Sequence, residues 1–434
     1  MDNVARGAVL ITIDCLRLDR VLRGVTVNLA RLARRGALFT NVVANGSRTA
    51  TSFASIFTST PPLAHRVLAR RFTSLIPDFR ITTLYPLQLR AGIPTLAEAL
   101  ARAGFSTAGF HSNPMLSSRY GYGRGFRRYV DLRQGAGRGG RRGRPLRALR
   151  ISGRMWLNAL TRLWRGLCLL KARLRVSLGR APSMTVESPY ATADAVTEAA
   201  LSWLREEGRG RFFLWLHYMD PHAPYVSSLN YLEAKGLDVE YFTVKLLELH
   251  CRLLYHQRPS RSDMKWLSFF YDACVRYVDQ HIRLLLEGME ELGLGPDNTF
   301  IVVTADHGEL LGEHGRVGHG HVLYEELIRV PLVLCGPGVK PGSRVGEQVN
   351  LMDLAPTLLE VLGVEPLASF RGRSLLPLLD GIQLESVRPV VSEEWDGRLL
   401  LSCRVGSLKY VVAVEDRRLR EELLDVSVRE TPYE

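Results

Sequence analysis

An aspartate and a histidine stand side by side at the end of an apolar run. Residues 299–303, with the sequence TFIVV, lead through Thr304 and Ala305 into Asp306 and His307. A β-branched run of this length is typical of a buried strand, and open α/β sheets gather their chemistry at the carboxyl ends of strands. A carboxylate beside an imidazole can hold a divalent metal ion, which can polarise an anionic ester. The pair therefore predicts half of a metal site.

Three other segments place polar side chains just after expected strands. Asp14 follows the apolar run 8–13, and Thr49 lies in a polar loop that leads into a helix. The third segment is HYMDPHAPY, residues 217–225, and the pair Asp306-His307 is itself followed by the histidine-rich stretch GHGH, residues 318–321. Because strand ends of a doubly wound sheet converge on one edge, we expect these groups to lie close together.

Strands and helices alternate along most of the chain, which predicts an α/β fold with a parallel or mixed sheet covered on both faces. The expected strands are 8–13, 37–43, 105–110, 212–216, 299–304 and 330–334. The expected helices are 28–35, one starting near residue 51, 94–103, 192–207, 263–292 and 353–362. After Gly381 the short runs 389–393, 399–404 and 409–414 predict a small antiparallel subdomain. We expect a catalytic domain over 1–383 and this subdomain over 384–434.

The composition is that of a globular protein of the enzyme type. The chain has 434 residues, 46% of them hydrophobic, and its six cysteines are scattered without a C-x-x-C pair. A disulfide framework or zinc ribbon is therefore not expected. The first residues lack the layout of a signal peptide, and no uninterrupted apolar run reaches the roughly 18 residues that span a bilayer. A cytoplasmic protein is the expectation.

The positive charge is concentrated in one segment. The net charge is +13, and residues 132–186 hold fourteen Arg and Lys with no Asp or Glu, so the rest of the chain is close to neutral. Three interpretations remain open for this basic insertion. It could form a solvated helical hairpin, or contact anionic lipid or another polyanion, so that the protein sits peripherally at a membrane. It could also bind nucleic acid, which is least favoured because no nucleic-acid motif accompanies it.

Several motifs in order resemble the sulfatase branch of the alkaline phosphatase superfamily. They are VLITIDCLRLDR, TATSFASIFTS, LWLHYMDPHAPY, YDACVRYVDQHI, VVTADHGELLGEHG with the following GHGHVLYEELIRVPLVLCGPG, and VNLMDLAPTLLEVLG with GRSLLPLL. They cover most of the chain outside the basic insertion. The resemblance implies an alkaline-phosphatase-like α/β/α sandwich, a bound divalent metal, a nucleophile at a helix N-terminus, and cleavage of sulfate or phosphate esters.

Carried onto this chain, the resemblance implies that Asp14, Asp306 and His307 are metal ligands. Cys15 stands where many sulfatases keep a second aspartate ligand. The set therefore has fewer hard oxygens than usual and one imidazole, which shifts the preference from calcium towards zinc or manganese. We expect one divalent ion, Zn, Mn or Ca.

Thr49 occupies the position of the family's nucleophile. A hydroxyl at a helix N-terminus beside a dication ionises more easily than in water. Thr51 and Ser47 remain alternatives. The sulfatase pattern C/S-x-P-x-R, whose first residue becomes formylglycine, is replaced here by Thr49-Ala50-Thr51-Ser52-Phe53. An active enzyme would therefore use an unmodified hydroxyl.

The remaining site residues are expected to bind the ester or move a proton. His222 and His319 resemble the residues that hold the ester oxygens or protonate the leaving group, a task that suits imidazole. His321, Asp220 and Asn113 are the weaker candidates, for substrate binding. Either His319 or His321 could instead be structural, because both lie in a glycine-rich loop.

Three aspartates at family positions, Asp19, Asp279 and Asp353, are interpreted as scaffold or capping groups. The predicted function is hydrolysis of a small anionic ester, a sulfate ester or a chemically similar phosphate ester, through Thr49. Within the same superfamily, a phosphodiesterase, a phosphonate monoester hydrolase or a phospho-head-group transferase is the alternative. A catalytically silent polyanion-binding protein is the alternative from another class.

Overall fold

The structure is a computed structural model of the 434-residue chain. It describes residues 4–67, 70–76, 79–85, 88–133, 188–255, 259–382, 387–395, 398–415 and 418–425. The predicted basic insertion lies outside the described residues from residue 134 onwards. The expected division into two domains stays a prediction.

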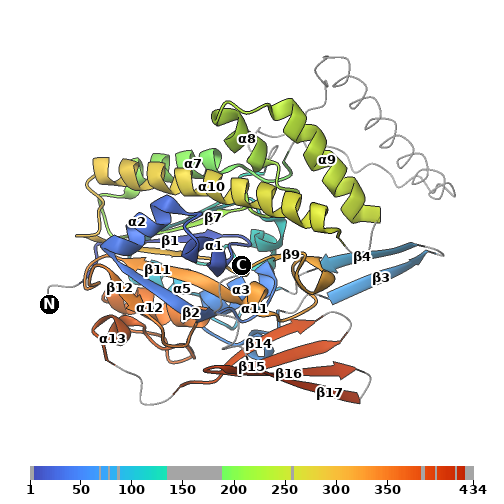
Figure 1. Ribbon diagram of the computed structural model, residues 1–434. Coiled ribbons are helices and arrows are strands. Elements are labelled where there is room, and N and C mark those ends of the chain that lie inside the picture. The colour runs from blue at the N-terminus through green and yellow to red at the C-terminus, as the bar shows by residue number, and fades with distance from the viewer. Residues whose placement is uncertain are drawn as a thin grey trace, which may run out of the picture.

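A mixed sheet forms the centre of the molecule (Figure 1). Within the described residues its strands run in the order β12-β2-β11-β8-β1-β7-β5-β6, and β13 also pairs with β2. All pairings are parallel except those of β11, which runs against both of its neighbours. The strands are β1 Gly7–Ile13, β2 Ala37–Val43, β5 Ser106–His111, β6 Arg128–Asp131, β7 Phe212–Tyr218, β8 Thr299–Thr304, β11 Arg329–Cys335, β12 Ser343–Val345 and β13 Val349–Asn350. The α/β fold class is confirmed.

Helices cover both faces of this sheet, as Figure 1 shows. One face carries α2 Val27–Arg35, α7 Ala193–Glu207 and α10 Arg261–Glu291, and the other carries α3 Thr49–Thr58, α5 Leu96–Arg102 and α12 Leu354–Val361. Every residue of β1, β7 and β8 is buried. Their continuous apolar sequences follow from this burial on two sides.

The three aspartates predicted as scaffold have that role. Asp279 accepts hydrogen bonds from the backbone of Asn28 and Leu29 at 2.9 Å each, and so fixes the start of α2 against α10. Asp353 accepts from the backbone N–H of Asn350 at 2.8 Å in a capping box. Asp19 forms ion pairs with three arginines, Arg17, Arg20 and Arg23.

A second, antiparallel sheet follows near the C-terminus, as predicted. It comprises β14 Val390–Trp395, β15 Leu399–Val405, β16 Leu408–Glu415 and β17 Arg418–Asp425, of which the last was not predicted. Its first strand is tied to the loop that precedes α3. The Ser392 hydroxyl donates to Ala44 O at 2.6 Å, and Glu393 N donates to Asn45 O at 2.8 Å.

Other elements were not predicted from the sequence. They include the antiparallel hairpin β3 Arg70–Ile76 and β4 Phe79–Tyr85, and the helices α8 Ser227–Ala234 and α9 Val239–Tyr255. Short helices are α1 Leu18–Leu22, α4 Pro62–His65, α11 Glu325–Ile328 and α13 Leu376–Leu379, and β9 Leu310–Leu311 pairs with β10 Val317–Gly318. Across the described ranges, no helix combines the length and apolar character needed to cross a bilayer.

Several strand bounds differ from the prediction by one or two residues, and one of these differences affects the site. The sequence placed the end of the strand that begins at Phe212 at Leu216, with His217 directly after it. Strand β7 instead continues to Tyr218, because His217 and Tyr218 still pair in register with Thr12 and Ile13 of β1. His217 is therefore a strand residue, buried in the sheet.

Candidate active site

The carboxyl ends of five strands meet at one edge of the sheet. Asp14 follows β1, and the α3 helix begins at Thr49 after the loop from β2. Asn113 follows β5, His217 lies at the end of β7, and Asp306 and His307 follow β8. Strand β11 is antiparallel to both β2 and β8, so β2 and β8 point the same way and β2 ends at the same edge.

Asp14 is the centre of this cluster and is completely buried. Its Oδ2 atom lies 3.3 Å from Thr49 Oγ1, 3.3 Å from Asn113 Nδ2 and 3.2 Å from His217 Nε2. Burial raises the pKa of Asp14, but the hydrogen bond from His217 and the charges of neighbouring histidines outweigh it and hold the pKa well below its usual value. Asp14 is therefore an ionised carboxylate at neutral pH.

The predicted ligands Asp306 and His307 lie beside Asp14. The His307 Nε2 atom is 3.5 Å from Asp306 Oδ2 and 3.9 Å from Asp14 Oδ1, and its Nδ1 donates to the Gly308 carbonyl at 2.9 Å. Asp306 Oδ2 is buried and has no hydrogen-bond partner among the described residues. Burial raises the pKa of Asp306. A buried carboxylate oxygen without a donor is what a cation site presents before the cation binds.

Two groups of side chains have the spacing of metal ligands. One consists of Asp14, His217 and Asp306, and the other of Cys15, His307 and His319, with the ligand atoms of each group within 4.8 Å of one another. The residues therefore fit a divalent cation. The first group mixes carboxylate with imidazole and the second is softer, with a thiol and two imidazoles.

His217 was missed as a candidate ligand. Its sequence signal was weak, because a histidine in the apolar run FFLWLHY is more often an ordinary core residue. In the structure its Nδ1 lies 3.0 Å from the Thr12 hydroxyl, which leaves Nε2 directed at Asp14. Only the pairing of β7 with β1 brings it into the cluster.

Thr49 is the first residue of α3 and is 5% exposed. Its Oγ1 atom lies 3.2 Å from His307 Nε2, in addition to its contact with Asp14. The two alternative hydroxyls are engaged elsewhere. Thr51 donates to Val67 O at 3.1 Å, and Ser47 donates to Glu394 Oε2 at 2.7 Å.

The histidines predicted to handle the ester lie next to this cluster. The His319 ring is 4.4 Å from the His307 ring and 4.9 Å from the His222 ring, measured between centroids. His319 Nδ1 lies 2.7 Å from Glu309 Oε2. Burial lowers the pKa of His319, and the charge of Glu309 acts in the opposite direction. Glu309 was not a predicted site residue, although it belongs to the quoted motif ADHGELLG.

The three residues predicted to bind the substrate lie at different distances from the cluster. Asn113 contacts Asp14 directly, as described above. Asp220 accepts a hydrogen bond from Ala193 N, at the start of α7, at 3.1 Å, so its visible role is at that helix rather than in the cluster. His321 Nδ1 lies 3.3 Å from Nη2 of Arg48, the residue before Thr49, and this places it at the edge of the site.

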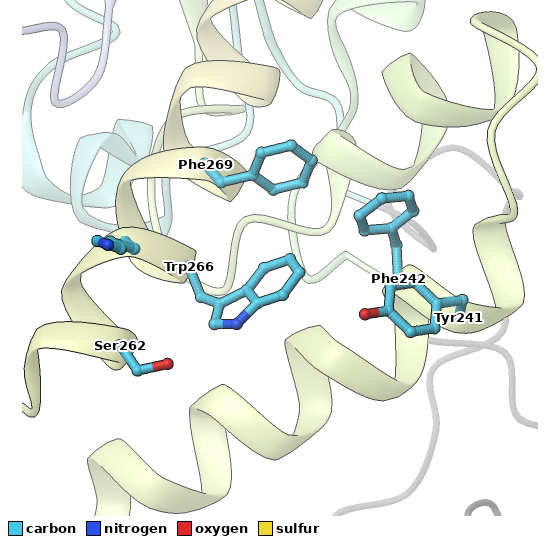
Figure 2. Close-up of a pocket in the computed structure, with 6 residues that line it drawn as sticks. Tyr241, Phe242, Ser262, Trp266 and Phe269 are labelled. Atoms are coloured by element: carbon cyan, nitrogen blue, oxygen red, sulfur yellow. The ribbon is translucent and has the colours of Figure 1, made fainter.

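A hollow of about 480 Å³ lies elsewhere, between α9 and α10 (Figure 2). Its lining is mostly aromatic and consists of Tyr241, Phe242, Ser262, Lys265, Trp266 and Phe269. It offers no carboxylate, imidazole or thiol from which a metal or acid–base site could be built. Its lining is therefore less suited to metal binding or acid–base chemistry than the edge of the sheet.

Comparison with known proteins identifies the family. The sulfatase family model matches residues 17–364. The chain belongs to the sulfatase family. Arylsulfatase K from Mus musculus is 26% identical over 266 residues, which cover 54% of this chain and 48% of that protein. Choline-sulfatase from Rhizobium meliloti is 29% identical over 241 residues, covering 51% of this chain and 45% of that protein. This sulfatase-family chain thus matches less than half the length of either relative.

Solved structures share the fold over nearly the whole chain. The structure of BT4656 in complex with its substrate D-glucosamine-2-N,6-O-disulfate matches with a TM-score of 0.69 and 18% identity, covering 98% of this chain and 92% of that one. The phosphonate monoester hydrolase SpPMH from Silicibacter pomeroyi matches with a TM-score of 0.66 and 21% identity, covering 98% and 89%. These likenesses show that the sulfatase-family chain has the fold of both.

Proposed function

We propose that this sulfatase-family protein hydrolyses a small anionic ester, with the unmodified hydroxyl of Thr49 as nucleophile. The observation that carries the proposal is the position of Thr49 Oγ1, at the N-terminus of α3 and within 3.3 Å of both Asp14 Oδ2 and His307 Nε2. The helix N-terminus favours the negative charge that develops on the hydroxyl. The hydroxyls of Thr51 and Ser47 are engaged in other hydrogen bonds, which supports Thr49 over them.

The cation would be held by Asp14 and Asp306, with imidazole ligation from His307 and His217. A divalent ion bound there supplies positive charge that neutralises a non-bridging ester oxygen and lowers the pKa of the Thr49 hydroxyl. Two carboxylates with imidazoles favour zinc or manganese over calcium, which prefers oxygen ligands. The Oδ2 atom of Asp306, which accepts no hydrogen bond from any residue that the structure describes, supports this assignment.

The other side chains of the site would position the reacting groups and transfer a proton. Asp14 lies within hydrogen-bond distance of the Thr49 hydroxyl and is itself held by the Asn113 amide, so this pair would fix the direction of attack. His319 delivers a proton to the leaving oxygen, and His222 beside it holds the ester or takes the same role. Attack by Thr49, whose proton passes to solvent, displaces the leaving oxygen and forms a covalent ester. Water then attacks the acid centre, breaks its bond to Thr49 Oγ1, releases the acid group and restores the hydroxyl.

A sulfate ester is the first candidate substrate, because the sequence relatives are named arylsulfatase K and choline-sulfatase. A phosphate diester or phosphonate monoester is the second. One observation favours it: residues 49–53 do not carry the pattern that sulfatases convert to formylglycine. Transfer of a phospho-head-group to an acceptor other than water is a variant of the same chemistry.

The test is a substrate panel run on the full chain. An aryl sulfate, a phosphate monoester, a phosphate diester and a phosphonate ester are assayed after loading with Zn²⁺, Mn²⁺ or Ca²⁺, and the bound metal is measured. We expect one or two of these esters to be hydrolysed with a tightly bound ion, and Thr49→Ala to lose at least about 1000-fold in kcat/KM.

The matched control is Thr51→Ala, two residues along the same helix. It removes a hydroxyl of the same kind and is expected to keep the activity within about tenfold. If Thr49→Ala retains turnover within a few-fold of the wild type, the nucleophile is another group. If the purified chain binds no divalent ion and turns over none of the esters, the binding-protein alternative is correct.

A further inference from the structure

A completely buried carboxylate stands next to the proposed proton donor. Glu309 Oε2 lies 2.7 Å from His319 Nδ1, and Glu309 Oε1 accepts a hydrogen bond from the Tyr225 hydroxyl at 2.9 Å. Both oxygens of one carboxylate are therefore engaged by side chains from two other segments. Such a fully bonded buried group has a single well-defined position.

The backbone that carries this carboxylate is also fixed. Arg17 Nη1 donates to the Glu309 carbonyl oxygen at 2.9 Å and to the Glu313 carboxylate at 2.6 Å. Just before Glu309, the Gly308 N–H donates to Leu327 O at 2.8 Å, and a Cβ at Gly308 would lie only 2.0 Å from Glu326 O. The chain therefore approaches α11 so closely that glycine is required at this position.

These contacts determine which nitrogen of His319 can act. An imidazole whose Nδ1–H is donated to a carboxylate presents Nε2 as its remaining functional atom. The ring lies between those of His307 and His222, where the proposed ester would bind. A carboxylate behind an imidazole fixes its tautomer and stabilises its positive charge.

We infer that Glu309 is a positioning residue for this reaction, which holds the His319 ring with Nε2–H towards the leaving oxygen. The inference rests on the proposed function. In the step itself, Thr49 Oγ1 gives up its proton to solvent and forms a bond to the acid centre. The bond between the acid centre and the leaving oxygen breaks, and that oxygen takes the proton from His319 Nε2. The Nδ1–H proton remains hydrogen-bonded to Glu309.

The experiment compares Glu309→Gln with the wild type on a series of aryl esters whose phenols differ in acidity. The acid group of the series is whichever the wild type turns over. An acidic phenol leaves without help, whereas a weakly acidic phenol needs the proton from His319. We expect Glu309→Gln to stay within about threefold of the wild type on the most acidic phenol and to lose on the order of 100-fold on the least acidic.

Tyr225→Phe is the matched control, because it removes the other hydrogen bond to the same carboxylate and leaves the one from His319. It is expected to keep the wild-type dependence on the phenol, and both variants are expected to keep the wild-type metal content. An equal loss across the series, or a loss of bound metal, in Glu309→Gln would overturn the inference. A failure of the proposed function is recognised separately, by full activity in Thr49→Ala.

Discussion

At the scale of single residues, burial and partner geometry decide which carboxylates are charged. Asp14 and Asp306 are both completely buried, yet the pKa of Asp14 is lowered whereas that of Asp306 is raised. The difference lies in their donors, since Asp14 accepts from four side chains and Asp306 Oδ2 from none among the described residues. The site therefore combines one carboxylate that the protein compensates with one whose Oδ2 atom no described donor compensates.

The buried carboxylate of Asp220 is expected to make the free energy of unfolding depend on pH, which can be measured independently of catalysis. Burial raises its pKa to about 7, so its ionisation above that value opposes folding. The pKa of Asp220 is higher in the folded chain than in the unfolded chain. Its contribution to the free energy of unfolding is therefore fully present below about pH 4 and is lost as the pH rises to about 7. We expect Asp220→Asn to raise the free energy of unfolding at pH 8 by as much as about 4 kcal/mol, with little gain at pH 4.

Denaturant titrations of both proteins at pH 4, 6 and 8 check this expectation. Asn keeps an oxygen that can accept the hydrogen bond from Ala193 N, so the helix contact is preserved. Asp194→Asn is the control, since it changes an exposed aspartate nearby whose pKa is lowered rather than raised. A difference between wild type and Asp220→Asn that does not grow with pH contradicts the assignment.

Residue types near strand ends could be predicted from the sequence, but partners inside elements could not. Asp14, Thr49, Asp306 and His307 were predicted from apolar runs that stop at polar groups, and the structure brings all four together. His217 was missed because it lies within a strand, where periodicity assigns it to the core. Glu309 gives no local signal either, because its role depends on His319, ten residues away.

At the scale of elements, the strands β2 and β8 have the predicted bounds because each is a continuous apolar run that ends at a polar loop. Helices α8 and α9 were missed because neither follows a clear cap, and their packing on α10 is a tertiary effect. The link between the C-terminal sheet and α3 was not foreseen. Nothing in the sequence of β14 indicates that Glu394 accepts a hydrogen bond from Ser47, which lies 347 residues earlier.

That link predicts a stability effect. Glu394 on β14 is 2% exposed, pairs with Arg48 at 2.6 Å and accepts from the Ser47 hydroxyl. Glu394→Ala would leave the buried Arg48 guanidinium without its carboxylate, so we expect a loss of about 3 kcal/mol in the free energy of unfolding. The control is Glu287→Ala, which breaks an exposed pair with Arg283 and is expected to lose less than about 1 kcal/mol.

Equilibrium denaturation of the two variants separates these cases. A loss in Glu394→Ala no larger than that in Glu287→Ala would show that the C-terminal sheet does not support the loop before α3. A large loss would show that this sheet, although remote from the metal ligands in the chain, holds the segment that carries Thr49.

At the scale of the whole molecule, the charge is divided between a nearly neutral body and one basic segment. Residues 132–186 account for an excess of fourteen positive charges in a chain whose net charge is +13. Basic segments of this size are attracted to anionic lipid by about 1 kcal/mol for each Lys or Arg near the surface. We therefore propose that the segment brings the protein to an anionic membrane, without a part in the chemistry.

Deleting residues 135–178 tests this separation of roles. The deletion is expected to leave hydrolysis of small soluble esters within about twofold, because the described site uses no residue of this segment. Binding to vesicles with 30% phosphatidylserine, measured by co-sedimentation, is expected to fall at least about tenfold, and binding to neutral vesicles to stay low for both proteins. A chain of unchanged length in which Gln replaces each Arg and Lys of the segment should behave like the deletion, because charge is the attracting force. If the deletion binds the anionic vesicles as well as the wild type, and added salt does not release either, the segment is a solvated part of the surface and the membrane proposal is wrong.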